Sequence, residues 1–91
     1  MAKIVMYTTQ ICPYCMRAKA LLRSKGVDFE EIDVGRDTRL REEAMRLSGG
    51  RRTVPQIFID DRSIGGYDEL WALDQAGELD QLLGSASETA E

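Results

Sequence analysis

The only two cysteines of the chain, Cys12 and Cys15, lie three positions apart in the stretch CPYC. Such a pair can form a structural disulfide, supply half of a metal site or act as a redox-active dithiol. A closed zinc site within one chain needs four ligands, and this sequence has no further cysteine and no histidine. Two cysteines could also lie together by chance as small apolar side chains. The residues around the pair must decide between these interpretations.

Composition and charge narrow the class of protein. The chain has 91 residues, 43% of them hydrophobic and 31% charged, with a formal net charge of -4. This describes one globular domain with no basic tract for nucleic acid and no apolar run of the roughly 18 residues that span a membrane. Four consecutive apolar residues near the N-terminus are too few for a signal peptide. We therefore expect a cytoplasmic protein, whose thiols are kept reduced, and a static disulfide is the least expected role for the pair.

The flanking sequence places the cysteines at the start of a helix. A buried strand over residues 3–8 leads to Cys12, Pro13 suits the first helical position, and Gly26 suits the position just beyond the end. The partial positive charge at a helix N-terminus favours a thiolate. We predict that Cys12 is the nucleophile and that its pKa lies below that of a free cysteine. Cys15, one turn deeper on the apolar face, is the predicted resolving thiol.

The remaining periodicities complete an α/β domain in the order β-α-β-α-β-β-α. A helix between the first two strands predicts that these strands are parallel, and the later hairpin predicts antiparallel strands, which together make a four-stranded mixed sheet flanked by helices. We assign residues 1–84 to this domain and expect 85–91 to be disordered. The other expected elements are a strand over 27–34, a helix over 37–50, a hairpin over 53–66 and a helix over 67–84 that is interrupted at Gly77.

Three separated motifs carry a resemblance to a known family. CPYC at 12–15, TVP at 53–55 and GGYD at 65–68 resemble the small bacterial dithiol glutaredoxins of the thioredoxin-like superfamily, from Lys3 to about Leu83. A thioredoxin would have tryptophan where Ile11 stands. The resemblance implies a thioredoxin-like fold and a monomer that reduces glutathione mixed disulfides and protein disulfides. Its reductant would be glutathione, with no metal or other cofactor, and its partners glutathionylated or disulfide-containing proteins.

The resemblance also implies a glutathione-binding groove. Pro55 would be cis and face the cysteines, and Val54 would bind the cysteinyl part through its backbone. The N–H groups of Tyr67 and Asp68 would hold the γ-glutamyl carboxylate, with the Asp68 side chain near the ammonium, and Tyr14 would line the groove. The full predicted set is Tyr14, Arg52, Thr53, Val54, Pro55, Gly66, Tyr67 and Asp68.

The residues by themselves suggest plainer roles for three members of this set. An X-Pro bond is trans in most proteins, so the sequence alone predicts a trans Pro55. Asp68 could simply cap the last helix. An exposed Tyr14 in a turn needs no further purpose.

The sequence departs from the family pattern at two places. Thr9 stands where the family usually has a lysine near the thiolate, and Arg52, or alternatively Arg39 and Arg41, could contact the glycyl carboxylate of glutathione instead. The stretch SGGRRTVP has one glycine more than expected, which could move Arg51 relative to the groove.

Two other functions stay open at this point. A glutathione-dependent [2Fe–2S] carrier would use Cys12 from each of two chains together with two glutathione thiolates. Pro13 argues against it, because relatives with that role typically have a different residue within the motif. A redox-inert interaction module is the third candidate, and it would show no turnover.

Overall fold

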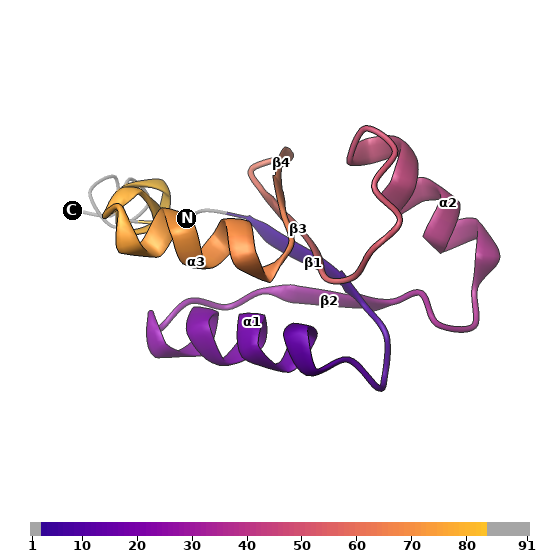
Figure 1. Cartoon of the computed structure of the whole chain (residues 1–91), viewed down its shortest axis with the longest axis horizontal. Helices are drawn as coiled ribbons and strands as arrows, with labels where there is room; N and C mark the ends of the chain where they lie inside the picture. The colour runs from indigo at the N-terminus through magenta and orange to yellow at the C-terminus, as the bar shows by residue number, and fades with distance from the viewer. Residues whose placement is uncertain (1–2, 84–91) are drawn as a thin grey trace.

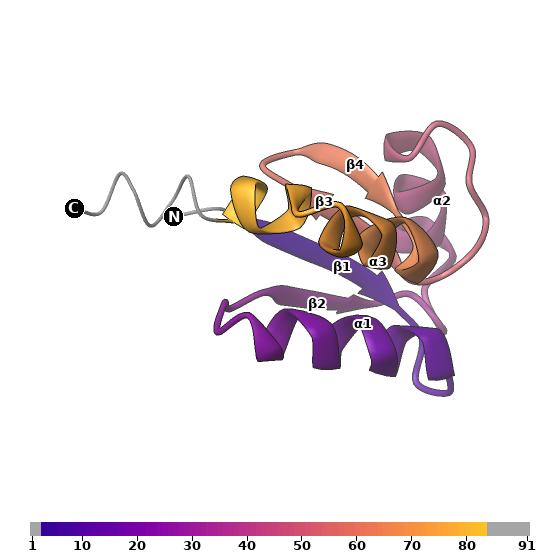
Figure 2. The same ribbon diagram turned by 60° about the vertical axis from the view of Figure 1, so that its left-hand side comes forward.

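The computed structural model describes residues 3–83 and confirms the predicted order of elements (Figures 1 and 2). Residue 84 and the segment 85–91, which we predicted to be disordered, lie outside the described residues. The strands are β1 (Ile4–Thr8), β2 (Glu30–Asp33), β3 (Gln56–Ile59) and β4 (Arg62–Gly65), and the helices are α1 (Pro13–Ser24), α2 (Thr38–Leu47) and α3 (Tyr67–Gln75). After a break at Gly77, residues 78–83 are again helical.

The four strands form one mixed sheet in the order β2-β1-β3-β4. β1 is parallel to β2 and antiparallel to β3, and β3 is antiparallel to β4. In the central strand, Tyr7 pairs with Ile32 on one side and with Gln56 on the other. Because β3 runs against β1, the residues before Gln56 lie at the same end of the sheet as the residues that follow Thr8. The TVP and CPYC motifs therefore meet there.

The second strand is shorter than the predicted range 27–34. Its ladder with β1 begins at Glu30, opposite Val5. Val27 and Phe29 are half-buried and pack against the core instead. Their apolar character therefore reflects packing of the connecting segment and not strand pairing.

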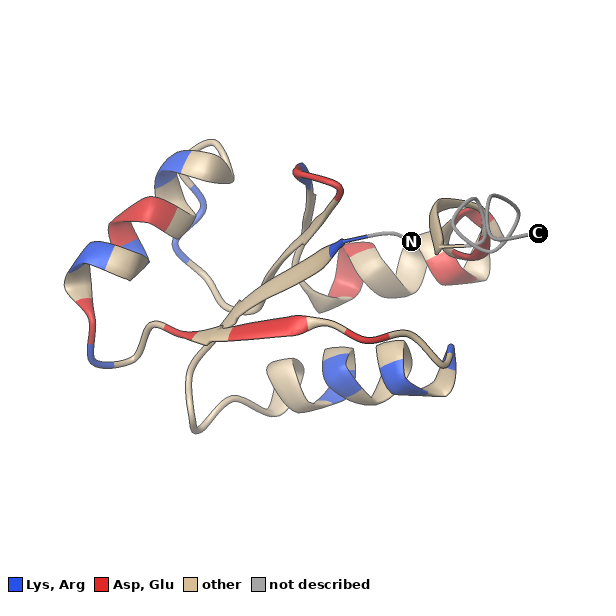
Figure 3. Cartoon of the chain, turned by 180° about the vertical axis from the view of Figure 1, so that it is seen from behind, with Lys and Arg blue, Asp and Glu red and all other residues tan. Residues whose placement is uncertain are grey.

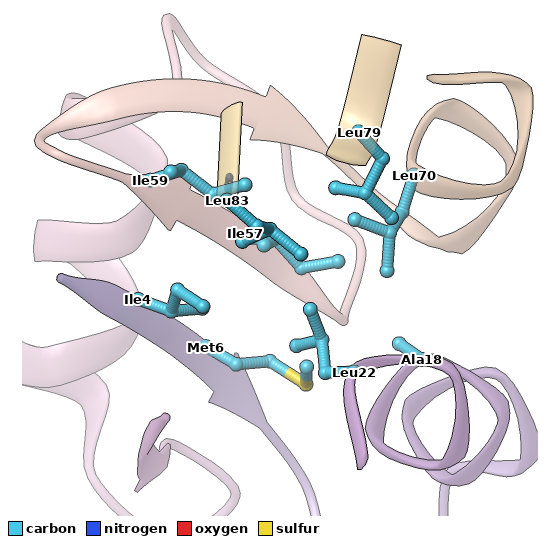
Figure 4. Close-up of a cluster of buried hydrophobic side chains, with 9 residues drawn as sticks. All are labelled: Ile4, Met6, Ala18, Leu22, Ile57, Ile59, Leu70, Leu79 and Leu83. Carbon is cyan, nitrogen blue, oxygen red and sulfur yellow. The ribbon is translucent and has the colours of Figure 1, made fainter. Parts of the chain in front are cut away.

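The sheet buries a different cluster of side chains on each face. Ile4 and Met6 of β1 alternate with Val5 and Tyr7, so the two pairs point to opposite faces. The main core joins the sheet to α1, α3 and the last helical turn, and Figure 4 shows its buried members: Ile4, Met6, Ala18, Leu22, Ile57, Ile59, Leu70, Leu79 and Leu83. The smaller cluster on the other face joins the sheet to α2 and consists of Tyr7, Val34, Ala44 and Phe58.

A charge contact ties α1 to the edge strand. The charged residues of α1 are all basic, whereas the neighbouring β2 is rich in acids (Figure 3). Lys19 Nζ lies 2.9 Å from Glu31 Oε2, which also accepts a 2.8 Å hydrogen bond from the buried Thr8 hydroxyl. These two donors, Lys19 first, lower the pKa of Glu31 below its ordinary value. The contact helps to fix α1 against the end of the sheet where the cysteines lie.

We expect truncation of the α1 packing face to destabilise the whole domain. Leu22 is fully buried in the main core. Leu22→Ala should lower the free energy of unfolding by about 2 to 5 kcal/mol, since it removes buried methyl groups and leaves a cavity. Leu47 at the end of α2 is 47% exposed and serves as the matched control. Leu47→Ala should cost about 1 kcal/mol or less in urea unfolding, and equal losses for the two variants would contradict the packing described here.

Candidate active site

The CPYC motif forms the first turn of α1, as the sequence predicts. Cys12 is the N-cap residue in an extended conformation (φ -149°, ψ 97°), and Pro13 takes the first helical position. The Cys15 N–H donates a 3.0 Å hydrogen bond to Cys12 Sγ. The Met16 N–H donates to the Cys12 carbonyl at 3.1 Å. A negative charge on the Cys12 sulfur would therefore be stabilised by a backbone donor and by the helix dipole.

Cys12 and Cys15 are joined in a disulfide, with their Cα atoms 5.2 Å apart. The two sulfurs differ in access. Cys12 is 7% exposed, whereas Cys15 is 1% exposed and lies on the packing face of α1. A substrate can reach the pair only from the Cys12 side.

The loop before β3 forms one wall beside the disulfide. Cys12 Sγ lies 3.8 Å from the Val54 carbonyl oxygen, a contact and not a hydrogen bond because a disulfide sulfur carries no proton. The Val54–Pro55 peptide is cis, as the family resemblance implies and contrary to the trans bond expected from the residues alone. The buried Gln56 side chain holds this loop, since its Nε2 donates to the Thr53 carbonyl at 2.8 Å and to the Thr53 hydroxyl at 3.2 Å.

The N-terminus of α3 forms the opposite wall. Its N-cap residue is Gly66, whose N–H donates a 2.7 Å hydrogen bond to Glu69 Oε1. The interpretation of Asp68 as the helix cap is therefore wrong. The helix begins at Tyr67, so Asp68 occupies the second helical position, and the side chain that reaches back to the N-cap comes from the third position. Asp68 is exposed and remains available to a ligand.

A groove of about 270 Å³ lies between these walls. The Tyr14 and Tyr67 rings approach each other across it, with centroids 6.4 Å apart. Seven of the eight predicted glutathione-binding residues line the groove: Tyr14, Thr53, Val54, Pro55, Gly66, Tyr67 and Asp68. The fold thus brings residues from three motifs that are distant in the sequence to one surface next to Cys12.

Arg52, the eighth predicted residue, is exposed and is not among the residues that line the groove. Arg51 and Glu69 line it instead, and they form an ion pair with Nη2 and Oε1 2.9 Å apart. Two features of the sequence could have indicated these residues: the extra glycine before Arg51, and the three-residue spacing from Gly66 to Glu69. Arg41, another predicted anion ligand, lines a separate depression on the surface.

Comparison with known proteins decides the family. The glutaredoxin family model matches residues 4–64. The chain belongs to the glutaredoxin family. It is 57% identical to glutaredoxin 3 of Escherichia coli over 83 residues, which cover 91% of this chain and 99% of that protein.

Solved glutaredoxin structures share the fold. The solution structure of a glutaredoxin from Brucella melitensis is 51% identical, with a TM-score of 0.80, and the match covers 91% of this chain and 89% of that one. A buckwheat glutaredoxin–glutathione complex has a TM-score of 0.85 at 26% identity, over 94% of this chain and 80% of that one. The thioredoxin-like fold predicted from the motifs is therefore confirmed.

This glutaredoxin is a glutathione-dependent thiol–disulfide oxidoreductase with its redox centre at Cys12 and Cys15. Both cysteines of the motif lie within bonding distance in one chain, so the geometry does not favour the alternative of an iron–sulfur carrier. Within residues 3–83, no three side chains of the metal-ligating types are grouped closely enough to hold a metal ion.

The first-turn geometry predicts different reactivities for the two thiols of the reduced protein. Cys12 should react with iodoacetamide with an apparent pKa well below the roughly 8.5 of a free cysteine, because the helix N-terminus stabilises its thiolate. Cys15 should react slowly, since it is buried. Mass spectrometry of the alkylated peptides across a pH series would measure both rates. Equal rates at the two sulfurs, or a Cys12 midpoint above about 8, would contradict this assignment.

Proposed function

We propose that Cys12 attacks the mixed disulfide and that Cys15 resolves protein disulfides. The Cys12 thiolate attacks the glutathione sulfur of a glutathionylated protein, the protein thiolate leaves, and glutathione becomes disulfide-bonded to Cys12. The thiolate of a second glutathione then attacks this bond at the glutathione sulfur, which releases oxidised glutathione and regenerates the Cys12 thiolate. The greater exposure of Cys12 and its contact with the Cys15 N–H support this order.

A disulfide between two protein cysteines requires the second thiol. Attack by Cys12 leaves the target protein joined to Cys12, and the Cys15 thiolate then attacks Cys12 Sγ to release the reduced target. The resulting Cys12–Cys15 disulfide, the state seen in the structure, is reduced by two molecules of glutathione. Because Cys15 lies in the same chain, its effective concentration at Cys12 is high.

Glutathione itself would lie along the groove. A cysteinyl residue that pairs with the Val54 backbone brings its sulfur to Cys12, because Cys12 Sγ is 3.8 Å from the Val54 carbonyl oxygen. The γ-glutamyl α-carboxylate would then reach the start of α3, where the N–H groups of the first turn have no partner within the helix. Tyr67 and Asp68 supply these groups, and the Asp68 carboxylate would meet the γ-glutamyl ammonium.

The proposed exchange with glutathione also suggests where the protein works and with which partners. We propose a monomer in the cytoplasm, where glutathione is reduced and abundant and can keep the dithiol turning over. The net charge of -4 supports protein and peptide partners rather than nucleic acid. None of the helices within residues 3–83 has the length and apolar content needed to cross a bilayer.

Variants of the two cysteines test the mechanism. Cys15→Ser should retain much of the activity on a glutathionylated peptide and lose about tenfold or more on a protein disulfide, because only the second reaction needs an internal thiol. Cys12→Ser should lose both activities. Assays coupled to glutathione reductase would measure the rates, with circular dichroism as the control for folding. Loss of deglutathionylation in a folded Cys15→Ser protein would rule the mechanism out.

Removal of the Asp68 carboxylate tests the orientation of glutathione. Asp68→Ala should weaken glutathione binding by about 1 to 3 kcal/mol, since the ammonium loses its charged acceptor, and it should leave the alkylation rate of Cys12 unchanged. Asp28 is an exposed acid before β2, at the opposite end of the sheet, and Asp28→Ala is the matched control. A lower melting temperature with an unchanged KM would remove Asp68 from the site.

A further inference from the structure

Arg51 and Glu69 line the groove, yet the glutathione site described above gives neither of them a role. They form an ion pair whose side chains are 43% and 42% exposed. Exposed pairs of this kind contribute little to stability, because water screens them. The position of the pair beside the start of α3 therefore calls for an explanation other than stability.

The structure holds Arg51 at two points. Its N–H donates a 3.2 Å hydrogen bond to Ser48 Oγ, and Ser48 Oγ lies 3.2 Å from the Met45 carbonyl that it can donate to, which fixes the Arg51 backbone to the end of α2. Its guanidinium donates to Glu69 Oε1 at 2.9 Å, and the same oxygen accepts the Gly66 N–H at 2.7 Å. Arg51 therefore spans the groove from α2 to α3. The Gly66 N–H and Arg51 lower the pKa of Glu69, so the pair stays charged at neutral pH.

Gly65 shows where the guanidinium lies. A Cβ atom at this position would be 2.7 Å from Glu69 Oε1 and 3.0 Å from Arg51 Nη1. Both charged groups thus pack directly against the backbone at residue 65, which also has a positive φ of 113° that favours glycine. The guanidinium lies at the turn that leads into α3, where it shares Glu69 Oε1 with the N–H group of the N-cap residue Gly66.

We propose that Arg51 binds the γ-glutamyl α-carboxylate of glutathione and that Glu69 is the residue that positions it. This inference rests on the orientation of glutathione proposed above. A guanidinium has five N–H donors, and the bond to Glu69 uses one, so donors remain for a planar carboxylate. The α3 N-terminus and Arg51 would then bind the same anion from two sides. The arginine that the sequence suggested for the glycyl carboxylate, Arg52, has no part in this arrangement.

Substrate analogues identify the carboxylate that Arg51 contacts. The assay uses peptides in mixed disulfide with glutathione, with glutathione amidated at the γ-glutamyl α-carboxyl, or with glutathione esterified at the glycyl carboxyl. The wild type should lose about tenfold or more in kcat/KM on the amide, because a charged hydrogen-bonding group is removed. Arg51→Ala should be weaker on glutathione itself and should distinguish it from the amide several-fold less than the wild type does, because only the N–H groups of α3 remain to bind the carboxylate. Its response to the ester should match that of the wild type.

Each possible failure has a distinct result. If the wild type treats glutathione and the α-amide alike, the proposed orientation of glutathione is wrong. If the wild type discriminates and Arg51→Ala does so equally well, or if Arg51→Ala loses its response to the glycyl ester instead, the role of Arg51 is overturned. Arg62→Ala, which removes an exposed arginine of the distant β3–β4 hairpin, is the control for the loss of one positive charge.

Glu69→Gln tests positioning separately. The amide oxygen can still accept the Gly66 N–H, but the charge that holds Arg51 is lost. We expect KM for the glutathionylated peptide to rise by about three- to tenfold, with kcat and melting temperature nearly unchanged. Adding Glu69→Gln to Arg51→Ala should cause little further loss, since the positioned group is already gone. Recovery of activity in the double variant would show that Arg51 merely neutralises Glu69, and would overturn the proposal.

Discussion

The hydrogen bond from the Cys15 N–H to Cys12 Sγ connects the fold of this glutaredoxin to its chemistry. This hydrogen bond forms because α1 begins at Pro13, with its N-terminus at the Cys12 sulfur. The direction of the α1 axis is set by the side chains that the helix buries. Ala18 and Leu22 are fully buried in the main core, so the helix cannot tilt away from the sheet without exposing apolar surface. Hydrophobic packing in the interior thus fixes the direction of a dipole at the surface.

The antiparallel pairing of β1 and β3 positions the loop that we propose to bind glutathione. It brings the loop that ends in Pro55 to the end of the sheet where Cys12 follows β1, and the pairing of Tyr7 with Gln56 shows the register. A slip of one residue would move the side chains of β3 to the opposite faces of the sheet. The Gln56 amide is bonded to Thr53, so the loop before β3 follows the register of that strand. The Val54 carbonyl is therefore held near the disulfide by the sheet itself.

Two adjacent acidic residues at the start of α3 have different roles. Glu69 satisfies the Gly66 N–H and pairs with Arg51, while Asp68 is left exposed toward the groove. If Asp68 capped the helix, its carboxylate would be unavailable for the contact that we propose with the γ-glutamyl ammonium. In the proposed glutathione site, the Glu69 carboxylate would repel the γ-glutamyl carboxylate at the same end of α3, and the Arg51 guanidinium would offset that repulsion.

The sequence alone determined the order of elements, the N-terminal position of Cys12 and the burial of Cys15, because these depend on short-range signals: a proline at the first helical turn and apolar residues at helical spacing. Seven of the eight binding residues predicted with the help of the motif resemblance line the groove. Only the tertiary structure decided that Arg51 and not Arg52 lines the groove and pairs with Glu69 at the start of α3. Arg51 and Arg52 are the same residue type and therefore have the same local propensities. Their roles differ because the loop between α2 and β3 meets the turn at Gly65 in space. Contacts between these distant segments decide which of the two arginine side chains lines the groove.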